Sequence, residues 1–246
     1  MTRVRIRFAK LGKIRWTSHR DTARMWERSF RRIELPLAYS QGFSPRPKVS
    51  FGLALSTGHE SVAEYLDLEL AAGADVEVGL LPALLSAALP AGVDATAAQI
   101  IDDRAPSLQE EVSLCTWRLC AAPAPASVPV TADELASRVE RVLGADEVVV
   151  TRKRKGTDVT DDIRPTILAV RVLGEAPDEG VWLECDLATR PRSLRPSELL
   201  IALGADLDER HVRRLHQWIE RDGARSEPLA APSAATDAPH ALERAS

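Results

Sequence analysis

Apolar and polar residues alternate over the first positions of the chain. Val4, Ile6 and Phe8 form one series, and the positions between and before them are arginines: Arg3, Arg5 and Arg7. A period of two residues is that of a strand with one face in the core. The pattern therefore predicts a half-buried strand over residues 3–8 with a basic outer face.

The next apolar series has the period of a helix. Ser18 and Asp21 form a capping box, which satisfies backbone N–H groups at a helix start. The apolar stripe behind it consists of Met25, Trp26, Ser29, Phe30 and Ile33. Proline does not fit a helix interior, so we expect this helix to end at about Ile33, before Pro36.

The remainder of the first half continues as a mixed pattern. Residues 39–48 are a loop, because they contain Gly42, Pro45 and Pro47. Alternation then predicts strands over 49–55 and 65–70, a turn at 56–61, a helix over 76–89 and a strand over 95–101. The order β-α-β-β-α-β is the ferredoxin-like arrangement.

A second series of elements begins at about Val112. Thr131 and Glu134 form another capping box, and its helix ends at Gly144. The other predicted elements are strands over 112–121, 147–154, 166–173 and 181–188, a short helix after Pro196 and a longer helix over about 208–221. We interpret this half as a second ferredoxin-like unit, although three successive strands fit that pattern imperfectly.

The sequence thus predicts an α+β protein of two tandem ferredoxin-like units with antiparallel sheets. The expected domains are residues 1–111 and 112–225. Residues 226–246 are rich in Ala, Pro, Ser and Glu without any apolar period, so we expect a disordered tail there.

The composition is typical of a globular protein in water. The 246 residues are 45% hydrophobic and 28% charged, which suffices for one or two cores. No run of 18 apolar residues is present, and the first residues lack the apolar segment of a signal peptide. We therefore expect a cytoplasmic protein without a membrane partner.

The cysteines and histidines do not indicate a metal site. Cys115, Cys120 and Cys185 are too few and too scattered for a disulfide framework. The five histidines show no metal-ligand spacing with them. We expect buried thiols, no metal and no cofactor.

Charged residues are distributed unevenly along the chain. The net charge of the chain is −4. Residues 1–55 hold 13 Lys and Arg against three acidic residues, a net of +10. Residues 56–115 hold 11 acidic residues against Arg104 alone, a net of −10. The asymmetry favours a polyanion partner for the basic end, and the alternative is that the acidic segment neutralises it internally.

The predicted first helix carries arginines at intervals of four. They are Arg20, Arg24, Arg28 and Arg32, with Arg31 beside them. Like charges at this spacing repel by about 0.2–0.5 kcal/mol per pair, whereas guanidinium groups bind phosphates through paired hydrogen bonds. The stripe is a candidate nucleic-acid contact, and the alternative is a solvated face opposite the core.

The loop that follows strengthens this candidate. Ser40 and Gln41 offer neutral donors, and Arg46 and Lys48 add positive charge. Such a composition suits contacts with phosphate and sugar. The alternative is a plain Pro/Gly turn.

A second basic cluster lies at the tip of a predicted hairpin. Its residues are Arg152, Lys153, Arg154 and Lys155. Four consecutive cations on a projecting hairpin are typical of an arm along a nucleic-acid backbone. The alternative is a solvated tip neutralised by Asp158, Asp161 and Asp162. These aspartates could also hold a catalytic carboxylate or a magnesium ion, but no second carboxylate motif completes such a site.

Catalytic residues are harder to find. His19, with Tyr39 and Lys48 nearby in sequence, could act in metal-independent RNA cleavage. A capping or phosphate-contacting histidine is the favoured interpretation, so we expect no catalytic residue.

Several motifs resemble those of the radical SAM-linked domain family. They are RFAKLG at 7–12, WTSHRD at 16–21, YSQGFSPRPK at 39–48, SFG at 50–52 and EY at 64–65. The resemblance is strong over residues 3–70 and returns around 155–165. It implies a radical SAM protein as partner and suggests RNA-related work, but it assigns no catalytic residue. The chain lacks Cys-x3-Cys-x2-Cys, so it would be a stand-alone accessory form.

The leading hypothesis is a non-catalytic RNA-binding accessory protein of a radical SAM enzyme. The first alternative is an RNA-acting enzyme, either a metal-independent nuclease that uses His19 or a base-modifying enzyme that uses an aspartate near 158–162. Tandem ferredoxin-like units are similar in broad plan to CRISPR repeat-processing endonucleases and pseudouridine synthases, but fold does not fix function. Neither the Arg–Asp motif of the synthases nor the glycine-rich C-terminal loop of the endonucleases is evident in the sequence. The second is a protein–protein scaffold that docks through the acidic segment 56–115.

Overall fold

The computed structural model describes residues 2–154, 156–176 and 179–229. The chain forms two compact units. Unit 1 contains the residues up to Val112 and those from Ile219 on, and unit 2 contains Ser113–Trp218. The fold is mixed α+β with antiparallel strand pairing, as expected, and the described residues include five α-helices.

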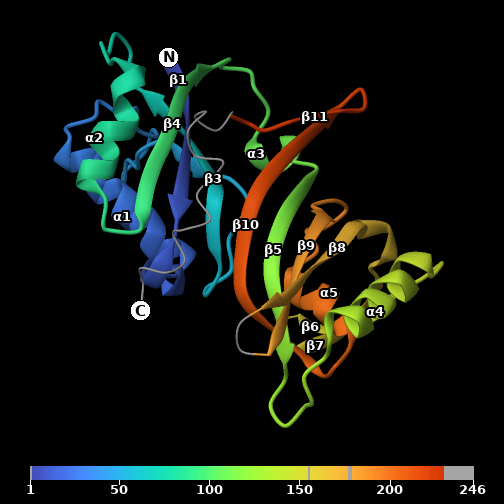
Figure 1. The fold of residues 1–246 in the computed structure, drawn as a ribbon. Helices are drawn as coiled ribbons and strands as arrows, with labels where there is room; N and C mark the ends of the chain where they lie inside the picture. The colour runs from blue at the N-terminus through green and yellow to red at the C-terminus, as the bar shows by residue number, and fades with distance from the viewer. Residues whose placement is uncertain (1, 155, 177–178, 230–246) are drawn as a thin grey trace. The chain divides into compact units, whose positions relative to one another are not determined.

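Unit 1 places its helices against an antiparallel sheet (Figure 1). Its elements are β1 (Thr2–Lys10), α1 (His19–Arg32), β2 (Val49–Phe51), β3 (Glu60–Leu70), α2 (Leu81–Ala88), β4 (Val93–Ile101), the short α3 (Leu108–Glu111) and β11 (Ala224–Ser226). The strand order is β4-β1-β3-β2. β1 therefore lies between β3 and β4, antiparallel to both.

The apolar face of β1 and the apolar stripe of α1 form the core of unit 1. Ile6, Phe8, Trp26 and Phe30 are all buried, and the ring centroids of Phe8 and Trp26 are 4.9 Å apart. Burial of such a side chain contributes about 1.5–3 kcal/mol. Ser18 caps α1 as expected, since its side chain accepts the backbone N–H of Asp21 at 3.2 Å. Both elements thus form where the sequence pattern predicts them.

The basic face of β1 is also buried, and acidic partners surround it. Arg5 is 3% exposed, and it donates to Asp67 at 2.8 Å and to Glu111 at 3.0 Å. Burial opposes the charge of Arg5, yet the hydrogen bonds and negative charges of Asp67 and Glu111 raise its pKa above the ordinary value. Asp67 also accepts from Arg3 at 2.7 Å. Internal neutralisation therefore accounts for part of the charge asymmetry.

The end of the described chain packs over the same face. Glu227 lies 3.6 Å from Arg7, and the hydroxyl of Tyr65 donates to the carbonyl of Leu229 at 3.3 Å. Leu229 is buried in a small cluster with Ala63, Tyr65 and Leu108. The expectation of disorder from residue 226 is therefore wrong for 226–229, because one carboxylate and one apolar side chain suffice to anchor a segment without periodicity. The rest of the predicted tail, 230–246, lies outside the described residues.

Unit 2 repeats the strand order with a hairpin added. Its elements are β5 (Leu114–Pro123), α4 (Ala132–Gly144), β6 (Val149–Arg154), β7 (Thr157–Asp162), β8 (Ile167–Ala176), β9 (Gly180–Ala188), α5 (Pro196–Leu203) and β10 (Leu207–Arg221), whose last residues belong to unit 1. The order in the main sheet is β10-β5-β9-β8, and β6 and β7 pair separately. Among the residues described here, all three cysteines are free and buried, and burial raises the pKa of Cys185.

One predicted element has the wrong type. The segment expected as a helix over about 208–221 is the strand β10. It pairs with β5, and its register shifts between Arg210 and Arg213 and again between Arg214 and His216. Each bulge inserts an extra residue and reverses the alternation of faces. Two bulges therefore hide the period of two that identifies a strand in the sequence.

Loss of the Asp67 charge should destabilise unit 1. In Asp67→Asn, Arg3 loses a carboxylate and buried Arg5 keeps only Glu111. Removal of one member of a buried ion network costs about 3–5 kcal/mol, so we expect a clear fall in Tm in thermal unfolding. Asp75→Asn, at an exposed aspartate, is the control and should leave Tm unchanged. Equal Tm values for the two variants would contradict this account of β1.

Candidate nucleic-acid interface

A groove of about 780 Å³ lies between α1 and the loop at residues 39–48. α1 contributes Arg20, Arg24, Glu27, Phe30 and Arg31, and the segment after it contributes Glu34, Leu35, Leu37, Tyr39, Pro45, Arg46 and Pro47. The two stretches singled out in the sequence as candidate contacts therefore form the walls of one concave site.

The loop wall is held by its own hydrogen bonds. The backbone N–H of Ser40 donates to the carbonyl of Arg46 at 2.8 Å, and the N–H of Arg46 donates to the Ser40 hydroxyl at 3.0 Å. Tyr39 and Pro47 form an isolated β-bridge just below. Gly42 has a φ of 131°, a conformation that glycine adopts without strain. Ser40 thus shapes the loop, and Gln41 lies exposed at its turn.

Helix geometry divides the predicted arginine stripe. With 3.6 residues per turn, side chains four apart drift by about 40° around the helix at each step. Arg20 and Arg24 line the groove, whereas Arg28 and Arg32 are absent from its lining. Arg32 instead donates to the carbonyl of Ala88, at the end of α2, at 3.1 Å. Arg31 lies eleven residues after Arg20, about three full turns, and completes the groove wall.

The groove carries a net positive charge. Four arginines face two glutamates, Glu27 and Glu34. Arg24 lies 3.5 Å from Asp21 in an exposed pair, which stabilises by at most about 1 kcal/mol. Arg20, Arg31 and Arg46 form no side-chain ion pair with the described residues. These three guanidinium groups are therefore available to a ligand.

Lys48, predicted from the sequence as a nucleic-acid contact, pairs with a carboxylate outside the groove. Its ammonium lies 2.6 Å from a carboxylate oxygen of Glu69 on β3, and it does not line the groove. The pairing follows from the sheet, because β2 lies next to β3 and Lys48 immediately precedes β2. Lys48 thus secures the base of the loop.

The second basic cluster is only partly free. Arg152 on β6 lies 3.1 Å from Asp161 of β7 and 3.3 Å from Glu198 of α5. Arg192 contacts the same two carboxylates, at 3.1 and 2.9 Å. Lys153 is exposed opposite Asp158. The Arg154 side chain and Lys155 lie outside the described residues. Arg152 is therefore a structural residue that ties the hairpin to α5.

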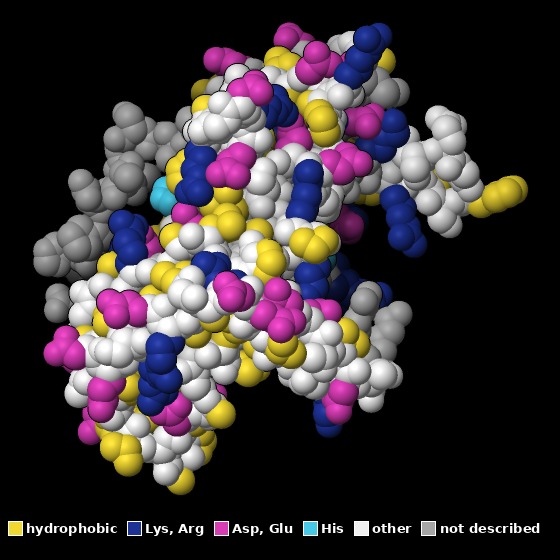
Figure 2. All heavy atoms as spheres, turned by 90° about the vertical axis from the view of Figure 1, so that its right-hand side faces the viewer, with side chains coloured by type: hydrophobic (Ala, Val, Ile, Leu, Met, Phe, Trp, Pro, Cys, Tyr) yellow, Lys and Arg dark blue, Asp and Glu magenta, His cyan; other side chains and the backbone are white. Residues whose placement is uncertain are grey.

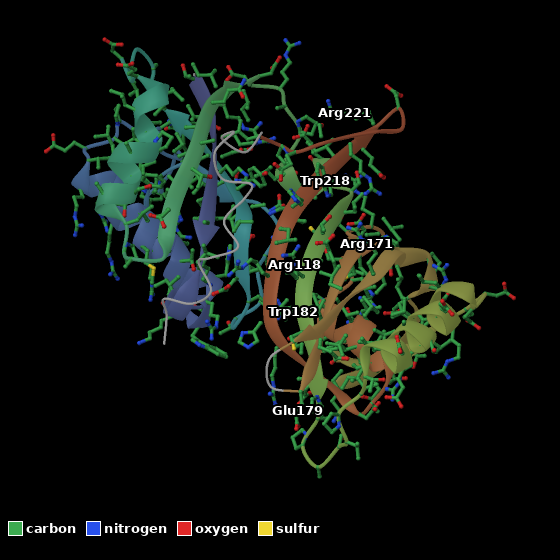
Figure 3. The ribbon with its side chains drawn as sticks, in the orientation of Figure 1. Arg118, Arg171, Glu179, Trp182, Trp218 and Arg221 are labelled. Carbon is green, nitrogen blue, oxygen red and sulfur yellow. The ribbon has the colours of Figure 1, made fainter. Side chains whose placement is uncertain are left out.

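The open face of the unit 2 sheet also balances its charges. Arg118 of β5 and Arg171 of β8 are labelled in Figure 3. Both donate hydrogen bonds to the carboxylate of Glu184 on β9. Figure 2, which faces the right-hand side of Figure 1, shows basic and acidic side chains interspersed on the visible surface. These arginines therefore have acidic partners, in contrast to Arg20, Arg31 and Arg46 of the groove.

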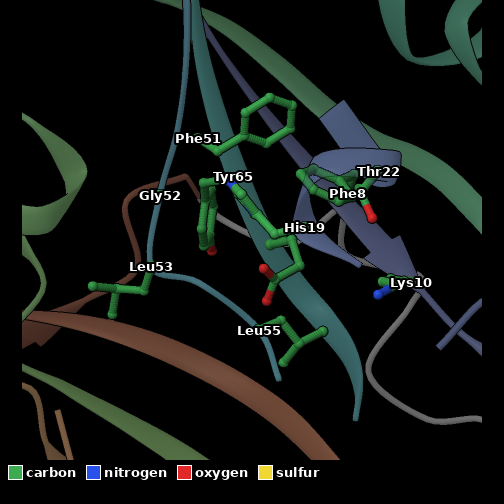
Figure 4. A pocket seen from close by; sticks show the side chains of 10 residues that line it. Phe8, Lys10, His19, Thr22, Phe51, Gly52, Leu53, Leu55 and Tyr65 are labelled. Atoms are coloured by element: carbon green, nitrogen blue, oxygen red, sulfur yellow. The ribbon is translucent and has the colours of Figure 1, made fainter. Parts of the chain in front are cut away.

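His19, Tyr39 and Lys48 have different surroundings. His19 lines a cavity of about 20 Å³ with Lys10, Glu64 and Tyr65 (Figure 4), and its ring lies edge-on to Phe51. Such a volume suits about one water molecule. Burial lowers the pKa of Lys10, against the opposing charge of Glu64. The cavity is too small for a nucleotide. Tyr39 lines the groove and Lys48 pairs with Glu69, so His19, Tyr39 and Lys48 do not form the catalytic group considered from the sequence.

Within 2–154, 156–176 and 179–229, no three His, Cys, Asp or Glu side chains are grouped so that they could hold a metal ion. In the same residues, no helix combines the length and apolar character needed to cross a membrane.

The sequence interpretation missed two groove features. Arg31 was noted only as a neighbour of the stripe, although its spacing of eleven from Arg20 places both on one helix face. Tyr39 lines the groove and Phe43 projects fully exposed from the loop. Only 4% of the residues are aromatic, which argues against a binding surface built on aromatic stacking, but the position of these two rings within the basic loop could have identified them.

The chain belongs to the DUF2344 family, described as an uncharacterized protein conserved in bacteria, whose model matches residues 3–196. That description names no radical SAM protein. Membership of an uncharacterized bacterial family is therefore confirmed, whereas the link to radical SAM proteins stays a prediction. No curated protein matches the sequence.

Two solved structures are similar to the chain. A crystal structure of a Cbf5-Nop10-Gar1 complex matches with a TM-score of 0.50 and 12% identity, over 87% of this chain and 48% of that one. The structure of an H/ACA RNP bound to a substrate RNA containing 2'-deoxyuridine matches with a TM-score of 0.46 and 13% identity, over 86% and 47%. This chain spans about half the length of the chains it matches. At such identities the likeness concerns the fold alone.

Glu198 should matter for stability rather than for binding. Its side chain is 7% exposed and faces Arg152 and Arg192. In Glu198→Gln two arginines lose a common carboxylate, so we expect unit 2 to lose about 2–4 kcal/mol in denaturant unfolding. Glu147→Gln, at an exposed glutamate of the same unit, should change stability by less than about 0.5 kcal/mol. Matching losses in both variants would contradict the assigned role of this network.

Proposed function

We propose that the protein binds RNA through the groove of unit 1 and acts as a non-catalytic accessory protein. The observation that supports this most directly is the set of guanidinium groups on the groove walls, from Arg20, Arg24, Arg31 and Arg46. Arginine pairs with phosphate in a planar, two-bond geometry. A concave wall of such groups, three of them without an ion pair among the described residues, suits an RNA backbone.

The partner enzyme in this proposal is a radical SAM protein. Its support is the motif resemblance over residues 3–70, the same stretch that builds the groove. The accessory protein would hold the RNA while the partner supplies the chemistry. We also interpret both units as ferredoxin-like, because β4-β1-β3-β2 and β10-β5-β9-β8 are equivalent antiparallel orders and the β6–β7 hairpin is an insertion between α4 and β8.

Ion pairs within unit 1 take up part of the charge of the acidic segment. Asp67, Glu69 and Glu111 belong to that segment, and each pairs with a basic residue of unit 1. In contrast, Arg20, Arg31 and Arg46 of the groove form no ion pair with the described residues, which favours RNA binding in the groove over docking through the acidic segment.

Binding can be tested with two arginines of the same helix. Arg31 lines the groove and Arg28 does not, and both are exposed. Because a hydrogen bond to a charged group contributes about 1.5–3 kcal/mol, Arg31→Glu should weaken RNA binding about tenfold, whereas Arg28→Glu should change it about twofold or less. Fluorescence anisotropy with a labelled RNA, repeated over a series of salt concentrations, measures both affinities and the salt slope.

The dependence of RNA affinity on salt concentration is a second test of binding in the groove. Counterion release predicts that affinity falls steeply with salt for the wild type, and that Arg31→Glu lowers the slope by about one. An affinity independent of salt, or an equal loss in the two variants, would refute binding in this groove.

A further inference from the structure

We propose that the groove of unit 1 takes a single-stranded RNA segment with unstacked bases, and not the backbone of a duplex. The inference rests on the proposed function and narrows its substrate class. Three properties of the groove carry it: the mixed charge of its walls, its apolar floor and the two exposed rings of its loop.

The walls carry carboxylates among the guanidinium groups. Glu27 and Glu34 line the same groove as Arg24 and Arg31. A duplex presents mainly phosphates and sugars to a protein surface, and the carboxylates would repel those phosphates. An unpaired base presents N–H donors on its edge, which a carboxylate accepts. The alternation of both charges along α1 therefore suits backbone and base edges together.

The floor of the groove is apolar. Phe30 and Leu37 form part of it and are 2% and 8% exposed, and Leu35, Pro45 and Pro47 continue it toward the loop. Sugar and phosphate gain little from such a surface, whereas the face of a base does. The volume of about 780 Å³ lies in the range of pockets that enclose small molecules, which suits a few unpaired nucleotides.

Two aromatic rings of the loop at residues 39–48 are exposed. Tyr39 is 50% exposed and lines the groove, and Phe43 is fully exposed at the turn of the loop. The hydrogen bonds between Ser40 and Arg46 hold this turn in place. Proteins that bind single strands combine a basic groove with aromatic side chains on which bases stack. Phe43 makes no contribution to the core, so its ring is free to stack with a base.

The test compares a short unstructured RNA with the duplex of the same sequence at one ionic strength. We expect the wild type to bind the single strand about tenfold more tightly. Stacking on one ring supplies an effect of that size, so Phe43→Ala should remove most of the difference without altering the salt slope. Phe43→Trp keeps a stacking surface and should retain single-strand affinity.

The control is Trp16→Ala, at an exposed aromatic residue that belongs neither to the groove lining nor to the loop at residues 39–48; it should leave both affinities unchanged. Equal binding of single strand and duplex, unaffected by Phe43→Ala, would overturn this inference while the proposed RNA binding stands. Failure to bind either RNA would overturn both. Because Phe43 is fully exposed, its substitutions test binding without a loss of folding.

Discussion

The structure of unit 1 depends on burying the arginine face of β1. Moving a charge out of water costs several kcal/mol unless a partner replaces the water, and Arg5 finds two partners, Asp67 and Glu111. That requirement draws acidic residues from distant segments onto one sheet face and brings the segment at Glu227 over Arg7. Acidic groups that serve β1 cannot also neutralise α1. Arg20, Arg31 and Arg46, which line the groove without an ion pair among the described residues, thus keep their charge for a ligand.

Helix geometry then selects which of the remaining arginines act together. Spacing by four residues moves successive side chains around the helix, so that Arg32 turns toward the end of α2 while Arg20, Arg24 and Arg31 face the loop. Arg46 completes the set from the opposite wall. The hairpin arginine Arg152 is held by two carboxylates of unit 2. The two basic clusters, the groove arginines and the β6–β7 hairpin, therefore differ in whether acidic side chains lie beside them. The number of consecutive cations in the sequence does not reveal this difference.

Local patterns predicted much of this fold and some of the site. Caps at Ser18 and Thr131 and the alternation around Ile6 gave the first strand and two helices where they lie. The type of β10 and the pairing of Lys48 with Glu69 were not predictable, because bulges and long-range strand register decide them. The burial of Leu229 was not predictable either, because it depends on contact with Tyr65, which is far away in the sequence. The basic loop was correctly singled out, but its contact with α1 is a tertiary property.

Ultraviolet cross-linking of a bound single-stranded RNA, followed by mass spectrometry of the cross-linked peptides, tests the central claim most directly. The account predicts cross-links in the loop at residues 39–48, above all at Tyr39 and Phe43, and in α1. Cross-links confined to the β6–β7 hairpin or to the open sheet face of unit 2 would place the RNA elsewhere and contradict it.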